Sequence, residues 1–184
     1  AEKVPVWLTF DPAEGQLESR SITADRPILN VTDASYLESE GIVAVTGTAL
    51  ADNGTDALAF LLTLDREGNA LDIVYYRGAA GSQVQPTSVQ ALDATSVGKG
   101  FVLAGSYRDS LNQATGYAWA TRMSLDGTPQ WNQLYVPAGA ADVSLQSSWE
   151  ALEYDAIQER FVASGPAYYI ENGSVVRFEH RQLS

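Results

Sequence analysis

A motif that recurs at a regular interval constrains the fold of this chain more than any other feature of its sequence. The apolar segments Gly41–Gly47, Gly100–Gly105 and Arg160–Gly165 resemble one another, and their closing glycines are almost evenly spaced. Ser88–Leu92 and Ser148–Leu152 match at the same interval. A fixed period, here roughly sixty residues, indicates an array of similar structural units.

Each unit is expected to consist of four short β-strands. Runs rich in Val, Ile, Leu, Phe, Tyr, Trp and Thr alternate with Gly, Asp and Asn, which is the pattern of strands and turns. Several runs are almost continuously apolar, which suits strands buried on both faces. We therefore predict an all-β protein. The predicted strands are 28–36, 42–47, 57–64 and 70–76 in one unit, and 87–93, 101–106, 117–125 and 130–136 in the next.

The turns between the third and fourth strands share a local chemistry. Asp65 precedes Gly68, Asp126 precedes Gly127, and Gly15 closes a similar segment near the N-terminus. An Asp side chain can accept hydrogen bonds from backbone N–H groups ahead of it, and Gly tolerates the positive φ of a tight turn. We interpret these aspartates as turn residues rather than catalytic carboxylates.

Four-stranded units that repeat in this way are typical of β-propeller blades. The chain divides into a pair of strands at 4–22, a blade at 27–78, a blade at 86–137 and a partial blade at 147–184, in which a hairpin could turn at Asn172–Gly173. This amounts to about three to three and a half antiparallel blades, fewer than the roughly four to eight of known propellers. Further blades, a second chain or an open stack of sheets would each account for the shortfall.

The segment Ala59–Gly78, followed by Phe101–Gly105, resembles the bacterial-type β-propeller repeat family. The shared features are a strand ending in Leu-Asp, a Gly turn, a Tyr-bearing strand and a following Val-x-Gly strand. The resemblance covers about residues 6–165, rests on packing and turn residues, and ends after Gly165. It implies a propeller of an extracellular or cell-surface protein, and it brings no catalytic motif with it.

Composition excludes several classes of function. The 184 residues carry a formal net charge of −12, which repels phosphate backbones, so we expect no nucleic-acid partner. The chain has no cysteine, which excludes thiolate chemistry and cysteine-ligated zinc, and it has a single histidine, His180. No apolar run approaches the roughly 20 residues of a membrane-spanning helix, so we expect no membrane span.

Two kinds of binding or modification site are suggested by asparagine and aspartate. Asp52, Asn53 and Asp56 lie within five residues of one another, and such oxygen ligands suit calcium; a plain polar turn is the alternative. No other cofactor is indicated. Asn30, Asn53 and Asn172 begin glycosylation sequons, which matter only in a secreted eukaryotic protein.

Aromatic side chains allow two interpretations. The four tryptophans are Trp7, Trp119, Trp131 and Trp149, and three of them occupy equivalent positions in the repeated strands, which suits packing between neighbouring sheets. Exposed aromatic rings can also stack on sugars, so a glycan is a possible partner. Packing is the interpretation that their recurrence in strands favours.

A hydrolase acting on glycans would need two carboxylates roughly 5–10 Å apart. The available set lies near the end of the first strand of each unit: Asp33, Asp93, and Asp155 or Glu153. Their recurrence favours a structural role, and the sequence holds no phosphate-binding loop, nucleophile elbow or metal-binding His pair. We therefore expect a non-catalytic module for protein or glycan binding or structural assembly, with a glycan-active hydrolase as the alternative.

Overall fold

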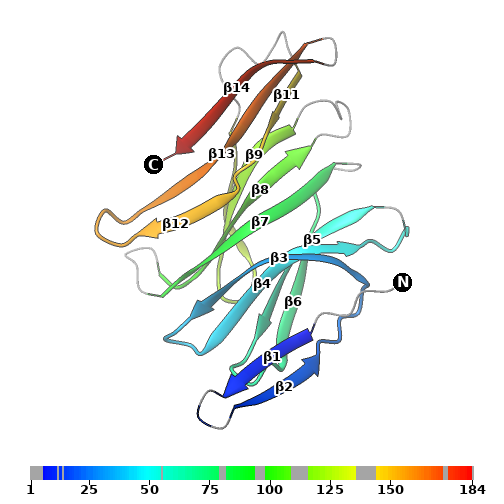
Figure 1. Ribbon diagram of the computed structural model, residues 1–184, viewed down its shortest axis with the longest axis vertical. Helices are drawn as coiled ribbons and strands as arrows, with labels where there is room; N and C mark the ends of the chain where they lie inside the picture. The colour runs from blue at the N-terminus through cyan, green and yellow to red at the C-terminus, as the bar shows by residue number, and fades with distance from the viewer. Residues whose placement is uncertain are drawn as a thin grey trace.

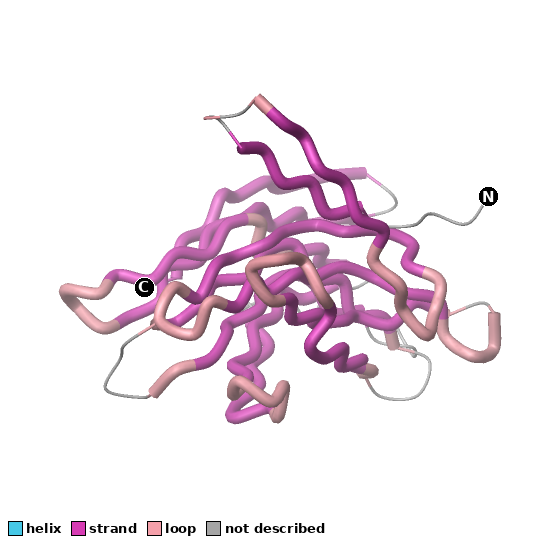
Figure 2. The backbone as a smooth tube through the Cα atoms, turned by 90° about the horizontal axis from the view of Figure 1, so that it is seen from below, coloured by secondary structure: helices cyan, strands magenta, loops and turns pink. Residues whose placement is uncertain are grey.

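The computed structural model describes residues 6–11, 13, 15–54, 56–78, 82–93, 98–108, 116–135, 144–171 and 174–183. Throughout these residues the regular structure is β-strand, as Figure 2 shows, and none of them forms a helix long and apolar enough to cross a membrane. The prediction of an all-β protein is confirmed. The strands are β1 (Val6–Asp11), β2 (Gln16–Ser21), β3 (Ile28–Leu37), β4 (Ile42–Leu50), β5 (Ala57–Leu64), β6 (Ala70–Tyr76), β7 (Gln83–Leu92), β8 (Gly100–Arg108), β9 (Gly116–Met123), β10 (Pro129–Tyr135), β11 (Ser144–Ser147), β12 (Ala151–Asp155), β13 (Arg160–Glu171) and β14 (Ser174–Leu183).

The strands form three sheets that follow one another along the long axis of the molecule (Figure 1). Strands β1 and β2 make an N-terminal hairpin, and β3-β4-β5-β6 make a four-stranded antiparallel meander. The remaining eight strands form one sheet that curls into half a barrel. Within that sheet β7, β8, β9 and β10 again pair in sequence order, so the predicted strand order of both complete units is observed.

The recurring glycine in the second strand of each unit is explained by the backbone of the strand beside it. The ladder between β3 and β4 shifts register at Val31–Asp33, and a Cβ on Gly47 would lie 2.0 Å from the Asn30 carbonyl oxygen. The ladder between β7 and β8 shifts at Pro86–Ser88, and a Cβ on Gly105 would lie 2.1 Å from the Gln85 oxygen. A bulge in one strand thus requires glycine in its neighbour.

The same close approach occurs in the C-terminal part of the chain. A Cβ on Gly165 would lie 2.0 Å from the Ser148 carbonyl oxygen. The backbone N–H groups of Ser148 and Glu150 donate to the carbonyls of Pro166 and Ser164 at 3.3 and 2.9 Å. Strands β11 and β12 therefore follow a single path along β13, interrupted by a bulge.

The C-terminal hairpin differs from the expectation for the last unit. Strands β13 and β14 pair antiparallel from Glu171 opposite Ser174, and the predicted turn residues Asn172 and Gly173 lie outside the described residues. However, β13 continues through Gly165 to Glu171, and β14 pairs with it as far back as Ala163 opposite Leu183. A hairpin at this place in the sequence was expected to supply the third and fourth strands of the unit. In the structure β13 and β14 are instead its second and third strands. After Gly165 the strand continues in a long ladder with β14, whereas β4 and β8 end at Leu50 and Arg108, soon after Gly47 and Gly105.

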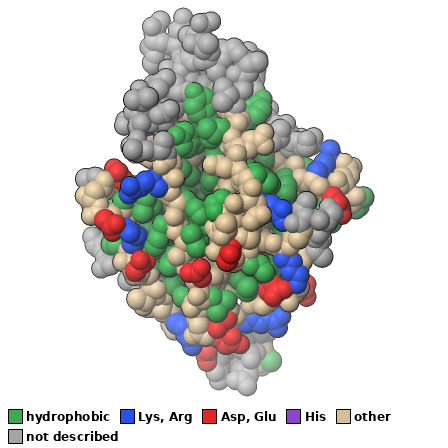
Figure 3. All heavy atoms as spheres, turned by 180° about the vertical axis from the view of Figure 1, so that it is seen from behind, with side chains coloured by type: hydrophobic (Ala, Val, Ile, Leu, Met, Phe, Trp, Pro, Cys, Tyr) green, Lys and Arg blue, Asp and Glu red, His purple; other side chains and the backbone are tan. Residues whose placement is uncertain are grey.

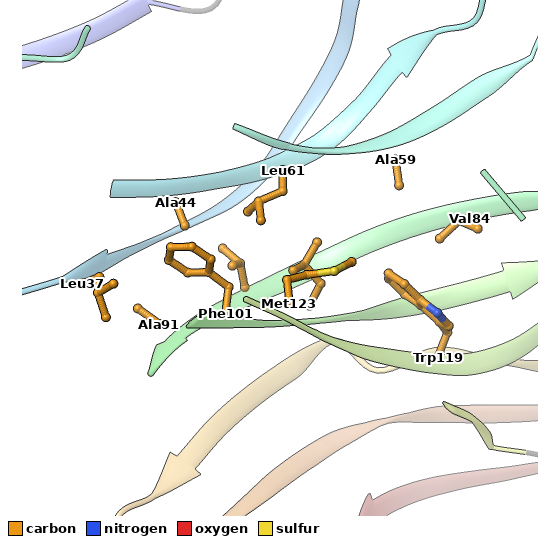
Figure 4. Packing of buried hydrophobic residues seen from close by; sticks show 11 residues of the cluster. Leu37, Ala44, Ala59, Leu61, Val84, Ala91, Phe101, Trp119 and Met123 are labelled. Atoms are coloured by element: carbon orange, nitrogen blue, oxygen red, sulfur yellow. The ribbon is translucent and has the colours of Figure 1, made fainter. Parts of the chain in front are cut away.

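The main core lies between the β3–β6 sheet and strands β7–β9. Figure 4 shows Leu37, Ala44 and Leu61 on one side facing Phe101 and Met123 on the other. All five side chains are at most 2% exposed to solvent. Close packing of two sheet faces accounts for the nearly continuous apolar runs of β5 and β8.

Two further cores cover the outer faces of these sheets. Phe60 and Leu62 on β5 point away from the main core and pack with Ile22, Ile28 and the half-buried Trp7 of the N-terminal hairpin. On the opposite side, small residues of β8 and β9 pack against Trp149 and β13. On the face opposite to that of Figure 1, apolar side chains form a central band, with acidic and basic groups around it (Figure 3).

Adding a methyl group at Gly105 tests the bulge geometry. Gly105→Ala is expected to lower the free energy of unfolding by about 1–3 kcal/mol, because the new Cβ would overlap the Gln85 backbone. Gly116→Ala is the matched control, since the nearest heavy atoms to its Cβ lie 3.9 Å away. Urea titration measures both variants, and equal destabilisation would contradict this explanation of the glycine.

Candidate functional site

The acidic turn after β4 is organised around an arginine. Arg26 donates two hydrogen bonds to Asp52, at 2.5 and 2.9 Å, and these lower the pKa of the Asp52 carboxyl. Asn53 and Asp56 bond to each other instead: the Asn53 amide donates to Asp56 at 2.7 Å, and the Asp56 N–H donates to Asn53 at 3.0 Å. The three predicted calcium ligands are therefore close in the chain but divided between two sets of partners.

No group of three or more His, Cys, Asp or Glu side chains among the described residues is arranged to hold a metal ion. A cation at this turn would compete with the Arg26 guanidinium for the Asp52 carboxylate. Of the predicted glycosylation sites, Asn30 is exposed on β3 and Asn53 is exposed in the turn, while Asn172 lies outside the described residues. These sites stay predictions.

Two of the four acids considered for catalysis join neighbouring sheets. The Asp33 carboxylate accepts hydrogen bonds from the Ser88 hydroxyl and the Val89 N–H, both at 2.9 Å. The Asp93 carboxylate accepts the Ser39 N–H at 3.0 Å, and hydrogen bonding to Ser39, chiefly to its side chain, lowers the pKa of Asp93. Both carboxylates thus link β3 and its following turn to β7 and its following turn.

The other two acids lie in the third unit. Asp155 accepts the backbone N–H groups of Ile157 and Gln158 at 3.0 and 3.1 Å and lies 3.8 Å from Arg160. Glu153 is exposed on β12. Asp33, Asp93 and Asp155 therefore have structural partners, whereas Glu153 is exposed.

The turn aspartates behave as predicted. Asp65 accepts the backbone N–H and the side-chain amide of Asn69 at 2.7 and 2.6 Å, and Asp126 accepts the Thr128 N–H at 3.0 Å. These hydrogen bonds, with that of the Ser124 hydroxyl to Asp126, lower the pKa of both carboxyls.

Tryptophan packing between sheets is confirmed for Trp119, whereas Trp149 is buried within the curled eight-stranded sheet. Trp119 is 4% exposed in the main core, where its indole N–H donates to Asn132 at 2.6 Å. Trp149 is 3% exposed and lies 5.5 Å from the Tyr135 ring. Trp131, by contrast, is 38% exposed beside a small apolar groove, with its ring edge-on to that of Phe161.

The clearest candidate for an interaction surface is the outer face of the N-terminal hairpin. Trp7 points inward to the β3–β6 sheet, so its neighbours Val6 and Leu8 point outward, and they are 53% and 59% exposed. Leu17 on β2 is 64% exposed and pairs with Phe10, which places it on the same face as Leu8. We call Val6, Leu8 and Leu17 the end face.

The glycines of the sheet turns also differ in whether a neighbouring sheet covers them. Gly68 and Gly127 have φ values of 79° and 75°, and a Cβ on either would lie within 2.6 Å of a side chain of the preceding sheet, Trp7 and Val74 respectively. Gly15 has a similar φ of 67°, but no described atom lies within 4 Å of its Cβ position. The hairpin turn is thus built like the other two and is left uncovered by the described chain.

No protein-family model matches this chain, and no curated protein matches its sequence.

The lowered carboxyl pKa values predict a specific acid sensitivity. A carboxyl whose pKa is lowered on folding stabilises the fold above the ordinary value of about 4, and this stabilisation is lost as the pH falls through the folded pKa. We therefore expect the free energy of unfolding to change little between about pH 7 and pH 5 and to fall below about pH 4.

Asp126→Asn is expected to flatten part of that fall, because it removes one of the carboxyls responsible. Glu153→Gln is the control, since this exposed carboxylate makes no side-chain hydrogen bond to the described residues. Urea titrations over the pH range measure both. An Asp126→Asn profile with the slope of the unmodified protein would show that the turn hydrogen bonds do not set the acid response.

Proposed function

We propose that this chain is a non-catalytic, propeller-like module, displayed outside the cell, that assembles with a second copy of itself through the end face. The observation that carries this proposal is the contrast between the sheet faces: those inside the molecule are covered, whereas Val6, Leu8 and Leu17 are each more than half exposed.

The propeller-like part of the proposal is supported by the strand order and the spacing of local features. Two four-stranded antiparallel units follow each other, and the third contains three strands. Gly47, Gly105 and Gly165 all lie against a backbone carbonyl of the neighbouring strand path, at 2.0–2.1 Å from their Cβ positions. A recurrent backbone requirement of this kind explains why glycine returns once in every unit of the sequence. The extracellular location is supported by the resemblance of Ala59–Gly78 to the bacterial-type β-propeller repeat family.

Assembly is supported by the chemistry of the end face. A pair of strands with apolar side chains on both faces is typical of a sheet lying between two others. Burying a large aliphatic side chain contributes roughly 1.5–3 kcal/mol, so three residues per protomer supply a meaningful driving force for association. An apolar patch without charged members is self-complementary, which suits a two-fold pairing of two hairpins. The charge of −12 per chain opposes association and makes it weaker at low salt.

The absence of catalysis is part of the proposal because the strand-end carboxylates already have structural partners. Asp33 and Asp93 connect two sheets, and Asp155 closes a turn. A carboxylate engaged in this way accepts protons poorly at neutral pH, as the lowered pKa of Asp93 illustrates. A hydrolase would instead need one carboxylic acid with a raised pKa.

The test is the solution mass measured by light scattering at two protein concentrations. We expect a mass that rises toward twice that of one chain as concentration increases, and a lower mass for Leu8→Ser combined with Leu17→Ser. Leu71→Ser is the matched control, because Leu71 on β6 is also exposed, at 55%, but lies outside the end face. A single-chain mass at both concentrations, or an equal effect of Leu71→Ser, would contradict assembly through this surface.

A further inference from the structure

A polar cleft lies where the eight-stranded sheet folds back on itself. Strand β11 is inserted there between β9 and β13, and it meets β9 in a single parallel bridge at Gln146 and Gly116. The cleft has a volume of about 160 Å³ and opens between the start of β7, the end of β8, β11 and β13. Strands β11 and β13 lie at the opposite end of the molecule from the end face (Figure 1), so the cleft does not depend on the proposed assembly.

The lining of the cleft differs in chemistry from the rest of the protein. Although the chain has 23 Asp and Glu residues, none of them lines the cleft within the described part of the structure. Gln83, Gln85, Gln146 and Arg108 are among the residues that line it instead. Among the described residues these four side chains form no hydrogen bond or ion pair, so no described group competes with a ligand for them.

The cleft is also held in shape before any ligand binds. The Ser147 hydroxyl accepts the Ala118 N–H at 2.8 Å and donates to the Gly116 carbonyl at 3.3 Å. Ser147 is only 6% exposed, so these bonds fix β11 against β9 and hold the neighbouring Gln146 at the cleft. A site that is organised in advance loses less conformational entropy on binding.

From these observations we infer that the cleft binds a sugar residue that carries a carboxylate. Sugar hydroxyls both donate and accept hydrogen bonds, as amide side chains do, so three amides suit a polyhydroxylated ring. A guanidinium pairs with a carboxylate through two parallel hydrogen bonds, so the carboxylate of the sugar would bind Arg108. The Tyr168 ring, opposite Gln146 on β13, offers flat apolar surface for the C–H groups of the sugar.

The size of the cleft limits the ligand to about one residue. Pockets that enclose drug-sized ligands have volumes of roughly 300–1,000 Å³, which is larger than this cleft. The protein therefore holds the terminal acidic residue of a glycan, with the rest of the glycan outside the cleft. The overall negative charge of the protein is screened beyond about 8 Å at physiological salt, so Arg108 acts on the carboxylate locally.

The probes are trigalacturonate and the same trisaccharide with its carboxyl groups reduced to alcohols. Binding is followed by NMR titration of the ¹⁵N-labelled full chain, whose amide shifts also report whether each variant is folded. We expect trigalacturonate to bind at least about tenfold more tightly than the reduced trisaccharide, since a charge-assisted hydrogen bond is stronger than a neutral one. The shifts of residues 83–85, 106–108 and 146–148 should change most.

Two pairs of variants separate the cleft from general charge effects. Arg108→Gln is expected to remove the preference for trigalacturonate, whereas Arg77→Gln, which deletes an exposed charge elsewhere, keeps it. Gln146→Leu is expected to weaken both trisaccharides, whereas Gln133→Leu on β10 weakens neither. Equal binding of the two trisaccharides, no shifts at the cleft, or equal effects of Arg77→Gln and Arg108→Gln would each overturn the inference.

Discussion

Burial of both faces of the central β3–β6 sheet is the constraint on which the rest of the structure depends. Leu61 faces β7–β9 and Phe60 faces the N-terminal hairpin, and both are at most 2% exposed. Neither face of a strand in this position is exposed to solvent, so the sequence of β5 is an almost unbroken run of apolar residues. The neighbouring sheets are therefore required for folding, and each must present an apolar face of its own.

The strand bulges make this stacking possible at a fixed spacing. A bulge bends the first strand of each unit and brings a backbone carbonyl close to the second strand. Glycine at that point of the second strand leaves room for this carbonyl, because it has no Cβ. The polar contacts between sheets lie close to these bulges: the Asp33 carboxylate, directly after the first one, accepts hydrogen bonds from β7. Packing, backbone geometry and polar contacts thus act on the same strands.

Much of this fold follows from local sequence signals. Both complete units, the aspartate–glycine turns and the burial of Trp119 were predictable, because each depends on residues within a few positions or on the period of the repeat. The role of β14 was not predictable, since whether a chain turns or continues after Gly165 depends on the strands available for pairing. The contact of Arg26 with Asp52 and the assembly of the glutamine-lined cleft were missed because they join segments distant in sequence, and no local pattern marks such pairs.

Hydrogen exchange of the backbone amides in β1 and β2, compared at low and high protein concentration, tests the central claim most directly. Covering the end face would slow the opening of the hairpin, so exchange in residues 6–21 should become slower at high concentration. Exchange in β5, which is covered within one chain, should stay the same. Exchange in the hairpin that does not depend on concentration would contradict the account, because it would mean that the stack of sheets ends with its outer face open to solvent.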